Sequence, residues 1–436
     1  MYRVWNFVTN YSLLLIIGAI LALIWANTAA HSYHLLVEYP LWFNDLIGYD
    51  IHHWEETMEL HHLHPEDFAH GDVHRVLTVH YLVNDILMAF FFAIAGKEVW
   101  EAVILKNGSL RGKKAATPLF ATVGGMVGPI AVYLGLALMM GSAKFGEVAN
   151  GWAIPTATDI AFSYLVGRLV FGAGHPAVRF LLLLAIADDA AGLVILAVFY
   201  PEGELAPAWL LLSVAAAVGV YVLFNWLPRK LDRGNQARPK STWVRQKLSW
   251  WPYLIAGALS WFGFAQSGLH PALGLLPIVP TLPHADRAFG IFSEAEQYLT
   301  DLLNHTEHLL KHPVEIVLFL FGLMNAGVEF SSIAEPTWLV LAGLIIGKPI
   351  GILLFGWLGA HVLKFGLPEG MRTIDLVVIG CVAAIGFTVS LFVASVAFDP
   401  GPVQDAAKMG ALLSFAAAII SIVAGKMAKV QKIPYA

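Results

Sequence analysis

Four ionisable residues lie near the middle of otherwise apolar runs of this 436-residue chain. A charged side chain at the centre of a lipid bilayer costs a few kcal/mol, so an ionisable residue at that depth is a candidate for function. At about 1.5 Å per helical residue, Asp189 lies roughly 14 Å from Phe180 and Lys348 roughly 15 Å from Trp338, close to mid-membrane. The four residues are Asp188 and Asp189 in the run 180–200, Asp159 in the run 152–171, and Lys348 in the run 338–362.

The adjacent acids Asp188 and Asp189 are typical of a site that binds either a proton or a cation. Successive helical residues point about 100° apart, so the two carboxyl groups cannot share one partner symmetrically, and we expect different roles for them. Burial and a second acid nearby both favour the protonated carboxyl group, and such a pair titrates as a unit. Carboxylate oxygens also suit hard cations. Competition between proton and cation for one site is then sufficient for exchange.

Two helix interruptions are predicted near this pair, one in each half of the chain. Residues 154–159 contain Pro155, which lacks an amide hydrogen, and residues 380–388 contain two glycines. Unwound backbone at membrane depth is tolerated only inside protein or beside water, and paired interruptions in two halves of a transporter indicate its binding site. Asp159 and Lys348 could neutralise helix ends at these interruptions. Thr158 and the free carbonyl groups offer further oxygen ligands.

The elements that position these residues are membrane-spanning helices. Hydrophobic residues make up 58% of the chain and charged residues 13%, and the mean hydropathy is +0.68, which excludes a soluble protein. The apolar runs are continuous rather than alternating, so we predict an all-α polytopic membrane protein. About twelve spans are expected, near residues 11–29, 81–104, 115–140, 151–171, 180–200, 207–227, 250–266, 269–283, 314–331, 338–362, 375–397 and 405–427.

The distribution of basic residues predicts the orientation of the spans. With both termini in the cytoplasm, nearly all lysines and arginines outside the spans fall on the cytoplasmic side. Only Arg75, Lys144 and Lys408 fall on the other side. The net charge of −5 and the single cysteine, which excludes an intramolecular disulfide, add little. The first span could also be a cleaved signal peptide, which leaves the remaining topology unchanged.

The chain 1–436 is expected to form one transmembrane domain with three polar segments. A long loop at residues 30–80 is an extracytoplasmic insertion, and a basic cytoplasmic linker at residues 228–249 separates six spans from six. A third polar segment, at residues 284–313, is also cytoplasmic. The interruptions in the two halves indicate a structural repeat rather than a sequence repeat.

The sequence resembles the bacterial sodium/proton antiporters of the NhaA type over nearly its whole length, apart from residues 30–80. Each matching motif is weak alone, but their order and spacing together are specific. The motifs are 84–92 (NDILMAFFF), 96–99 (GKEV), 151–162 (GWAIPTATDIAF), 187–189 (ADD), 267–270 (SGLH), 325–328 (NAGV), 346–349 (IGKP) and 385–390 (IGFTVS).

This resemblance implies inverted repeats built around two crossing discontinuous helices. It implies that Asp189 is the principal cation and proton carboxylate, that Asp188 is paired with Lys348, and that Asp159 and Thr158 belong to the broken helix beside the site. The implied activity is an electrogenic secondary transport that exchanges cytoplasmic Na⁺ or Li⁺ for external H⁺ and contributes to pH and sodium homeostasis. The implied location is the bacterial inner membrane.

The resemblance also implies a set of residues for the pH response, namely Glu98, Glu101, His270, Glu307 and Asp85. The chain departs from the family at Lys97, where a small or apolar residue is expected and where a lysine could neutralise Glu98. The two residues after the aspartate pair differ as well, and the segment 284–312 is more acidic than the family pattern.

The insertion at residues 30–80 holds ten of the 17 histidines, mixed with nine acids and one arginine. A solvated polar loop without a ligand is the first interpretation. Imidazoles that titrate near pH 6 to 7 could instead sense external acidity. A metal site is a further alternative, with the candidate ligands His61, His62, His64, His70 and His74. In the similar family this loop pairs two subunits, so we expect a homodimer in the lipid bilayer.

Other classes of membrane protein fit the residues less well. A metal-dependent oxidase is the main alternative, but its histidines come from several segments, whereas these lie in one loop. An intramembrane aspartyl protease places its acids on different helices, and a channel would line a pore with them. We therefore expect a transporter rather than an enzyme, with no cofactor beyond the transported ions and no nucleic acid partner.

Overall fold

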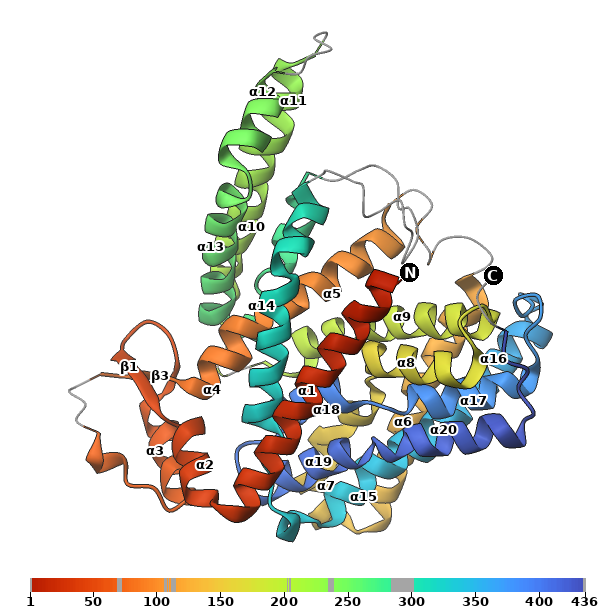
Figure 1. Cartoon of the computed structure of the whole chain (residues 1–436). Coiled ribbons are helices and arrows are strands. Elements are labelled where there is room, and N and C mark those ends of the chain that lie inside the picture. The colour runs from red at the N-terminus through yellow and green to blue at the C-terminus, as the bar shows by residue number, and fades with distance from the viewer. Residues whose placement is uncertain are drawn as a thin grey trace. The chain divides into compact units, whose positions relative to one another are not determined.

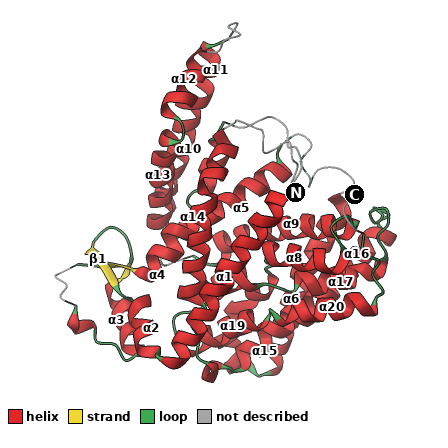
Figure 2. Cartoon of the chain, in the orientation of Figure 1, coloured by secondary structure: helices red, strands yellow, loops and turns green. Residues whose placement is uncertain are grey.

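The computed structural model describes residues 2–68, 73–105, 108, 110, 115–201, 203, 205–233, 239–283 and 302–433. Helices account for most of this part of the chain, and the strands are short and confined to the insertion (Figure 2). The all-α fold class predicted from the sequence is therefore confirmed. The backbone contacts divide the chain into two compact units.

The first unit comprises residues 81–109 and 193–318. Its helices α10 and α13 lie side by side as a long hairpin (Figure 1). Its α-helices are α5 (Met88–Val103), α10 (Leu210–Tyr221), α11 (Leu227–Leu231), α12 (Pro239–Trp243) and α13 (Trp251–Ser267), and its shorter 3-10 and π-helical turns are η2 (Leu82–Leu87), η5 (Pro207–Trp209), η6 (Val222–Trp226), η7 (Val244–Leu248), η8 (Pro271–Leu273) and η9 (Leu276–Thr281).

The second unit comprises residues 2–80, 110–192 and 319–436. Its elements are α1 (Tyr2–Thr28), α2 (Ala30–Val37), β1 (Pro40–Asn44), β2 (Tyr49–Asp50), α3 (Ile51–Leu60), η1 (Pro65–Asp67), β3 (Arg75–Thr78), α4 (Val79–Tyr81), α6 (Ala116–Met139), α7 (Ser142–Val148), η4 (Ala149–Thr156), α8 (Ile160–Phe171), η11 (Phe330–Ser332), α15 (Glu335–Ala342), η12 (Gly343–Gly347), α16 (Lys348–Trp357), η13 (Leu358–Val362), α17 (Thr373–Ala383), α18 (Phe387–Ala397), α19 (Pro402–Leu413) and α20 (Ala416–Met427). The short helix α4, whose last residue belongs to the first unit, and the helices α9 (Pro176–Phe199) and α14 (Leu302–Asn325) continue from one unit into the other.

Several helical segments of the described chain are long and apolar enough to cross a membrane. There are six such segments, or seven when the bent pair α17 and α18 is counted as one span. Shorter apolar helices lie at Leu14–Thr28, Ile160–Phe171, Pro271–Thr281 and Pro313–Asn325. The protein therefore spans the membrane several times, while the number twelve and the division into six and six stay predictions.

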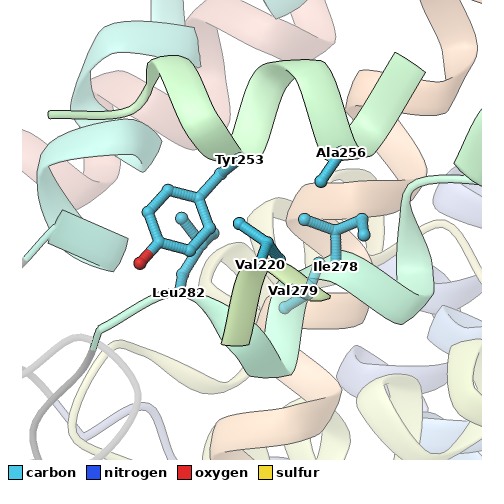
Figure 3. Packing of buried hydrophobic residues seen from close by; sticks show 6 residues of the cluster. All are labelled: Val220, Tyr253, Ala256, Ile278, Val279 and Leu282. Carbon is cyan, nitrogen blue, oxygen red and sulfur yellow. The ribbon is translucent and has the colours of Figure 1, made fainter. Parts of the chain in front are cut away.

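The core of the first unit is a cluster between α10, α13 and η9. Val220, Tyr253, Ala256 and Ile278 are buried there together with Val279 and Leu282 (Figure 3). Side chains from helices distant in sequence meet in this cluster, so burial of apolar surface holds the α10–α13 hairpin against the chain that follows it.

Two small-residue stripes bring α6 and α16 into close contact in the second unit. The backbone at Gly124 and Gly128 meets the backbone at Gly347 and Gly351, and a Cβ atom added at any of these four glycines would overlap the facing chain. Small residues four apart allow membrane helices to approach closely. This contact fixes the position of the first residue of α16, which is Lys348.

The insertion at residues 30–80 is a folded part of the second unit. The strands form a three-stranded antiparallel sheet in the order β1–β3–β2. Ile51, Trp54, Met58, Leu63 and Val76 form a small buried core between the sheet and α3. The insertion therefore has its own apolar core in addition to the polar surface predicted from its composition.

Candidate functional site

Two broken helices meet at their interruptions inside the second unit. In the first, the chain is extended at Ala157 between η4 and α8. In the second, α17 and α18 are bent by 54° at a short break. The Asp159 amide donates to the Ile385 carbonyl oxygen at 2.8 Å, and the Thr158 hydroxyl donates to the Ala383 carbonyl oxygen at 3.2 Å. The unwound segments therefore satisfy part of their backbone polarity through each other.

The two halves of each broken helix pack against opposite halves of the other. The Ser163 hydroxyl of α8 donates to the Val382 carbonyl oxygen of α17 at 3.1 Å, and the Ser390 hydroxyl of α18 donates to the Ile154 carbonyl oxygen of η4 at 2.8 Å. The two broken helices therefore cross each other near their breaks. This crossing is the geometry that the resemblance to the NhaA-type antiporters implied.

The carboxylate of Asp159 caps two helix N-termini at once. One oxygen accepts from the Phe162 amide of α8 at 3.1 Å. The other accepts from the Thr388 amide of α18 at 3.3 Å and also from the Thr388 hydroxyl. Helix N-termini carry partial positive charge, so one negative charge is stabilised by two helices. This buried acid thereby joins the two breaks.

The ammonium group of Lys348 joins a helix C-terminus to an acid. It donates to the Asp188 carboxylate at 2.9 Å and to the carbonyl oxygen of Thr156, the last residue of η4. Lys348 and Asp188 are both buried. The positive charge therefore lies at the negative end of a helix, as well as opposite a carboxylate.

Asp189 differs from its neighbour in both exposure and partners. Its side chain is only partly buried, and within the described chain no group donates a hydrogen bond or forms an ion pair with it. The charges of Asp188, Asp159 and Lys348 all act on it. Since a carboxylate without donors keeps its lone pairs, Asp189 can accept a proton or a cation without first breaking a protein contact.

The neighbouring residue and the break offer further oxygen atoms for a hard cation. The Thr158 hydroxyl lies against the Asp188 carboxylate, and the break leaves carbonyl groups outside regular helical bonding. Two carboxylates, Asp188 and Asp189, act on the one lysine, so an additional proton or monovalent cation reduces the uncompensated negative charge. Oxygen ligands of this kind suit a hard cation, and burial strengthens the attraction between opposite charges.

Four of the residues assigned to the pH response belong to the first unit and not to the second, which holds the crossed breaks. They are Asp85, Glu98, Glu101 and His270. The Lys97 ammonium lies 3.0 Å from Glu101 and 4.0 Å from Glu98. The His270 imidazole lies 3.6 Å from the buried Asp85 carboxylate. The side chain of Glu307 lies outside the described residues.

The candidate metal ligands of the insertion lie in separate environments. His61 stacks on the imidazole of His34 with 3.7 Å between ring centroids, and burial lowers its pKa to about 4. His64 faces Glu66 at 3.2 Å and His74 faces Asp45 at 3.0 Å. His62 has a positive φ of 57°, and His70 lies outside the described residues. Within the described chain, no three His, Cys, Asp or Glu side chains are placed to hold a metal ion.

Thr388 is a residue of this site that the sequence reasoning did not single out. Its amide and hydroxyl groups both donate to Asp159. The signal was present in the sequence, since Thr388 follows the break at Gly386 and is the second residue of α18. The first residues of a helix have free amide groups that face an anion.

Comparisons with known proteins identify the family. The model of the family described as Na+/H+ antiporter 1 matches residues 3–427. The Na(+)/H(+) antiporter NhaA of Jannaschia sp. strain CCS1 is 74% identical over 99% of both chains. That of Geobacter sulfurreducens is 43% identical over 98% of this chain and 99% of its own, and that of Desulfitobacterium hafniense strain DCB-2 is 45% identical over 98% and 97%.

Among solved structures, the sodium proton antiporter MjNhaP1 from Methanocaldococcus jannaschii at pH 8 has a TM-score of 0.47 and 12% sequence identity, with 98% of this chain and 97% of that chain covered. The family model extends from near the first residue through α20. This chain, with its two crossed broken helices, is therefore a member of the Na+/H+ antiporter 1 family.

Proposed function

We propose that the protein exchanges cytoplasmic Na⁺ or Li⁺ for external H⁺ at Asp189. The observation that carries this proposal is the buried group of Asp159, Asp188 and Lys348 around a carboxylate that has no donor of its own in the described chain. Curated relatives with the name Na(+)/H(+) antiporter NhaA support it. The protein would then act in pH and sodium homeostasis at the bacterial inner membrane, with both termini in the cytoplasm.

The exchange follows from competition at one site. A deprotonated Asp189 attracts a sodium ion, with Asp188 and the Thr158 hydroxyl as further oxygen ligands. Protonation of Asp189 removes the charge that holds the ion. Because either occupant lowers the same excess of negative charge, the site would change its exposure from one side to the other when occupied. The crossed breaks are the elements that would move.

Electrogenic exchange needs a second proton-binding group besides Asp189. The Asp188–Lys348 pair is the neighbouring candidate, because a cation that draws Asp188 away leaves a buried ammonium without its acid partner. Loss of a proton from Lys348 would then relieve that charge. A cycle with more protons than sodium ions could be driven by the membrane potential.

The pH response would belong to the first unit. The candidates lie close to a side chain that carries, or can carry, the opposite charge. Glu98 and Glu101 lie near Lys97, and His270 lies near Asp85. Glu307 remains a candidate from the sequence resemblance. Lys97 would add a positive charge next to Glu98 that the family pattern lacks. The pH range of activity would therefore be specific to this chain.

A homodimer is proposed through the insertion. Strand β1 pairs with β3 on one side, and no described strand covers its other side. Trp42 on this strand is 52% exposed and Leu41 47% exposed. An exposed apolar edge strand is suited to pairing with a second copy. Disulfide cross-linking of a Trp42→Cys variant tests this proposal. The native cysteine, Cys381, is buried and should not react. A band at monomer size alone would argue against the dimer.

The transport proposal is tested with purified protein in proteoliposomes. A sodium or lithium gradient should drive proton movement, and a potassium gradient of the same size provides the comparison. Imposing a membrane potential should change the rate if the exchange is electrogenic. Proton movement that is the same with and without alkali cation gradients would contradict the proposed function.

A further inference from the structure

A second group of buried ionisable side chains in the second unit comes from the insertion and from α19. Glu38, the residue that follows α2, is 7% exposed, and Lys408 of α19 is 8% exposed. Both lie on the face that the distribution of basic residues predicts to be extracytoplasmic. Neither contributes to the crossed breaks, so this group needs its own explanation.

Glu38 is a buried acid whose carboxylate lacks a hydrogen-bond donor in the part of the chain that the structure describes. Its backbone carbonyl oxygen accepts from the Trp54 indole at 2.9 Å, which fixes the backbone of Glu38 within the insertion. Burial raises the pKa of Glu38 to about 7, and the charge of Lys408 opposes that rise. The ionisation of Glu38 therefore changes near neutral pH.

The other charged and titratable groups around Glu38 and Lys408 come from each neighbouring element. Burial lowers the pKa of His34 to about 3 and that of His61 to about 4, and it raises that of Tyr33, so these three are neutral at ordinary pH. His80 hydrogen-bonds to Tyr49 and lies 3.4 Å from the Asn325 amide oxygen. The remaining groups are His62, Glu329 and Asp405.

A chain of hydrogen bonds leads from Lys408 to α18. The Lys408 ammonium donates to the side-chain oxygen of Gln404 at 2.7 Å. The amide nitrogen of Gln404 donates to the carbonyl oxygens of Ser395 at 3.2 Å and Phe398 at 2.6 Å. These carbonyl groups belong to the C-terminal end of α18, whose residues 387–397 begin at the crossing with Asp159.

Helix α18 is therefore held at its N-terminal end by the Asp159 carboxylate and at its C-terminal end by Gln404, to which Lys408 donates. It has 11 residues, so the two attachments are roughly 16 Å apart along the helix. A change in the hold on one end alters the freedom of a short rigid element whose other end donates to the Asp159 carboxylate. This gives the group around Glu38 a physical route to the site.

We propose that Glu38 senses protons on the extracytoplasmic side and that its charge, acting through Lys408 and Gln404 on the end of α18, tunes cation binding at the crossing. When Glu38 is ionised, Lys408 is balanced and stays bonded to Gln404, and α18 is held firmly. When Glu38 is protonated, Lys408 loses part of its balancing charge and the hold on α18 weakens. This inference rests on the exchange proposed above and adds its regulation.

The test compares Glu38→Gln, which is fixed in the neutral form, with wild type in oriented proteoliposomes. The pH on the insertion side is varied from 6 to 8.5 while the other side is kept constant. At pH 8.5 the variant should show a several-fold higher KM for sodium than wild type, and at pH 6 the two should agree. Protons also compete directly at Asp189, but they do so equally in both proteins. Equal KM values at both pH values would overturn the proposal.

Glu59→Gln is the matched control, because Glu59 lies on the same insertion and is exposed. It should follow wild type at every pH, and a shift as large as that of Glu38→Gln would also overturn the proposal. If Glu38→Gln does not accumulate in the membrane, Glu38→Asp keeps an acid at the position. The pH at which KM changes must then move, and an unmoved midpoint would count against the proposal.

A titration that needs no transport separates this inference from the proposed function. Infrared difference spectra of the purified chain should show a protonated carboxyl signal that disappears near pH 7 in wild type and in Glu59→Gln, and that is missing in Glu38→Gln. Absence of sodium-driven flux in wild type would refute the function alone. A wild-type signal that Glu38→Gln retains would refute the role of Glu38 alone.

Discussion

Asp188 and Asp189 are neighbours in the chain, yet only Asp188 is held by a basic partner. The Lys348 ammonium lies 2.9 Å from Asp188, while no group in the described residues donates to Asp189. The helical rotation between them places one carboxylate against α16 and leaves the other partly exposed. Two consecutive residues thus supply one carboxylate paired with a buried lysine and one carboxylate without a donor in the described chain.

Replacement of Lys348 by alanine should weaken both exchange and stability. The substitution leaves Asp188 buried without its partner, which costs about 3–5 kcal/mol when a buried pair is broken on one side. Thermal unfolding of the purified protein in detergent and sodium-driven flux measure the two effects. The double change Lys348→Ala with Asp188→Asn should recover part of the lost stability but not the flux. Equal melting temperatures for wild type and Lys348→Ala would contradict the pairing.

Thr388→Val should reduce the apparent affinity for sodium. The hydroxyl of Thr388 donates to the Asp159 carboxylate, and a hydrogen bond to a charged group contributes about 1.5–3 kcal/mol, equivalent to roughly 10- to 150-fold in KM. The control is Ser395→Ala on the same helix, since among the described residues the Ser395 hydroxyl bonds only to the Phe392 carbonyl oxygen of its own helix. A KM that rises equally in both variants would show that the effect is not specific to Asp159.

Gly128→Ala should destabilise the protein, whereas Gly135→Ala should not. Both residues lie on α6, but a Cβ atom at Gly128 would meet the Gly347 carbonyl oxygen, and one at Gly135 would meet nothing within 4 Å. Because the obstacle at Gly128 is backbone, the helices must separate, at a cost of about 1–3 kcal/mol. Melting temperatures of the two variants provide the comparison. Similar values would mean that the α6–α16 contact is looser than described.

The sequence was sufficient to find the buried charges and the breaks, and insufficient to give their partners. Asp159, Asp188 and Lys348 stood out because charges in apolar runs are costly, and the breaks stood out because of Pro155 and the glycines near residue 386. The capping of two helices by one carboxylate depends on how the broken helices cross. That crossing is a tertiary relationship, which no local pattern specifies.

The insertion shows a different reason for partial success. Its histidines and acids predicted a polar surface, but α2, α3 and the sheet form around Trp54, Met58 and Val76, which are few and scattered in the sequence. Glu38 was not singled out, because one acid among nine in a polar loop carries no signal. Its burial arises only when the insertion packs against its surroundings in the second unit.

Glu38→Gln should change the pH dependence of stability. The folded pKa of Glu38, about 7, lies above its ordinary value of 4.5, so the folded chain binds the proton more tightly than the unfolded chain. The stabilising effect of that proton is complete below pH 4.5 and is lost as the pH rises through 7, by about 3 kcal/mol at most. The glutamine variant lacks this loss. Its melting temperature should therefore exceed that of wild type more at pH 8.5 than at pH 5, and a constant difference would exclude a raised pKa.

The competition of proton and cation for Asp189 is tested most directly by sodium-driven proton flux in everted membrane vesicles that contain Asp189→Asn. Asp67→Asn is the control, because Asp67 is an exposed acid of the insertion. With equal amounts of protein in the membrane, we predict wild-type flux for Asp67→Asn and no sodium-driven flux above background for Asp189→Asn. Wild-type flux in Asp189→Asn would contradict the claim that proton and cation compete for this carboxylate.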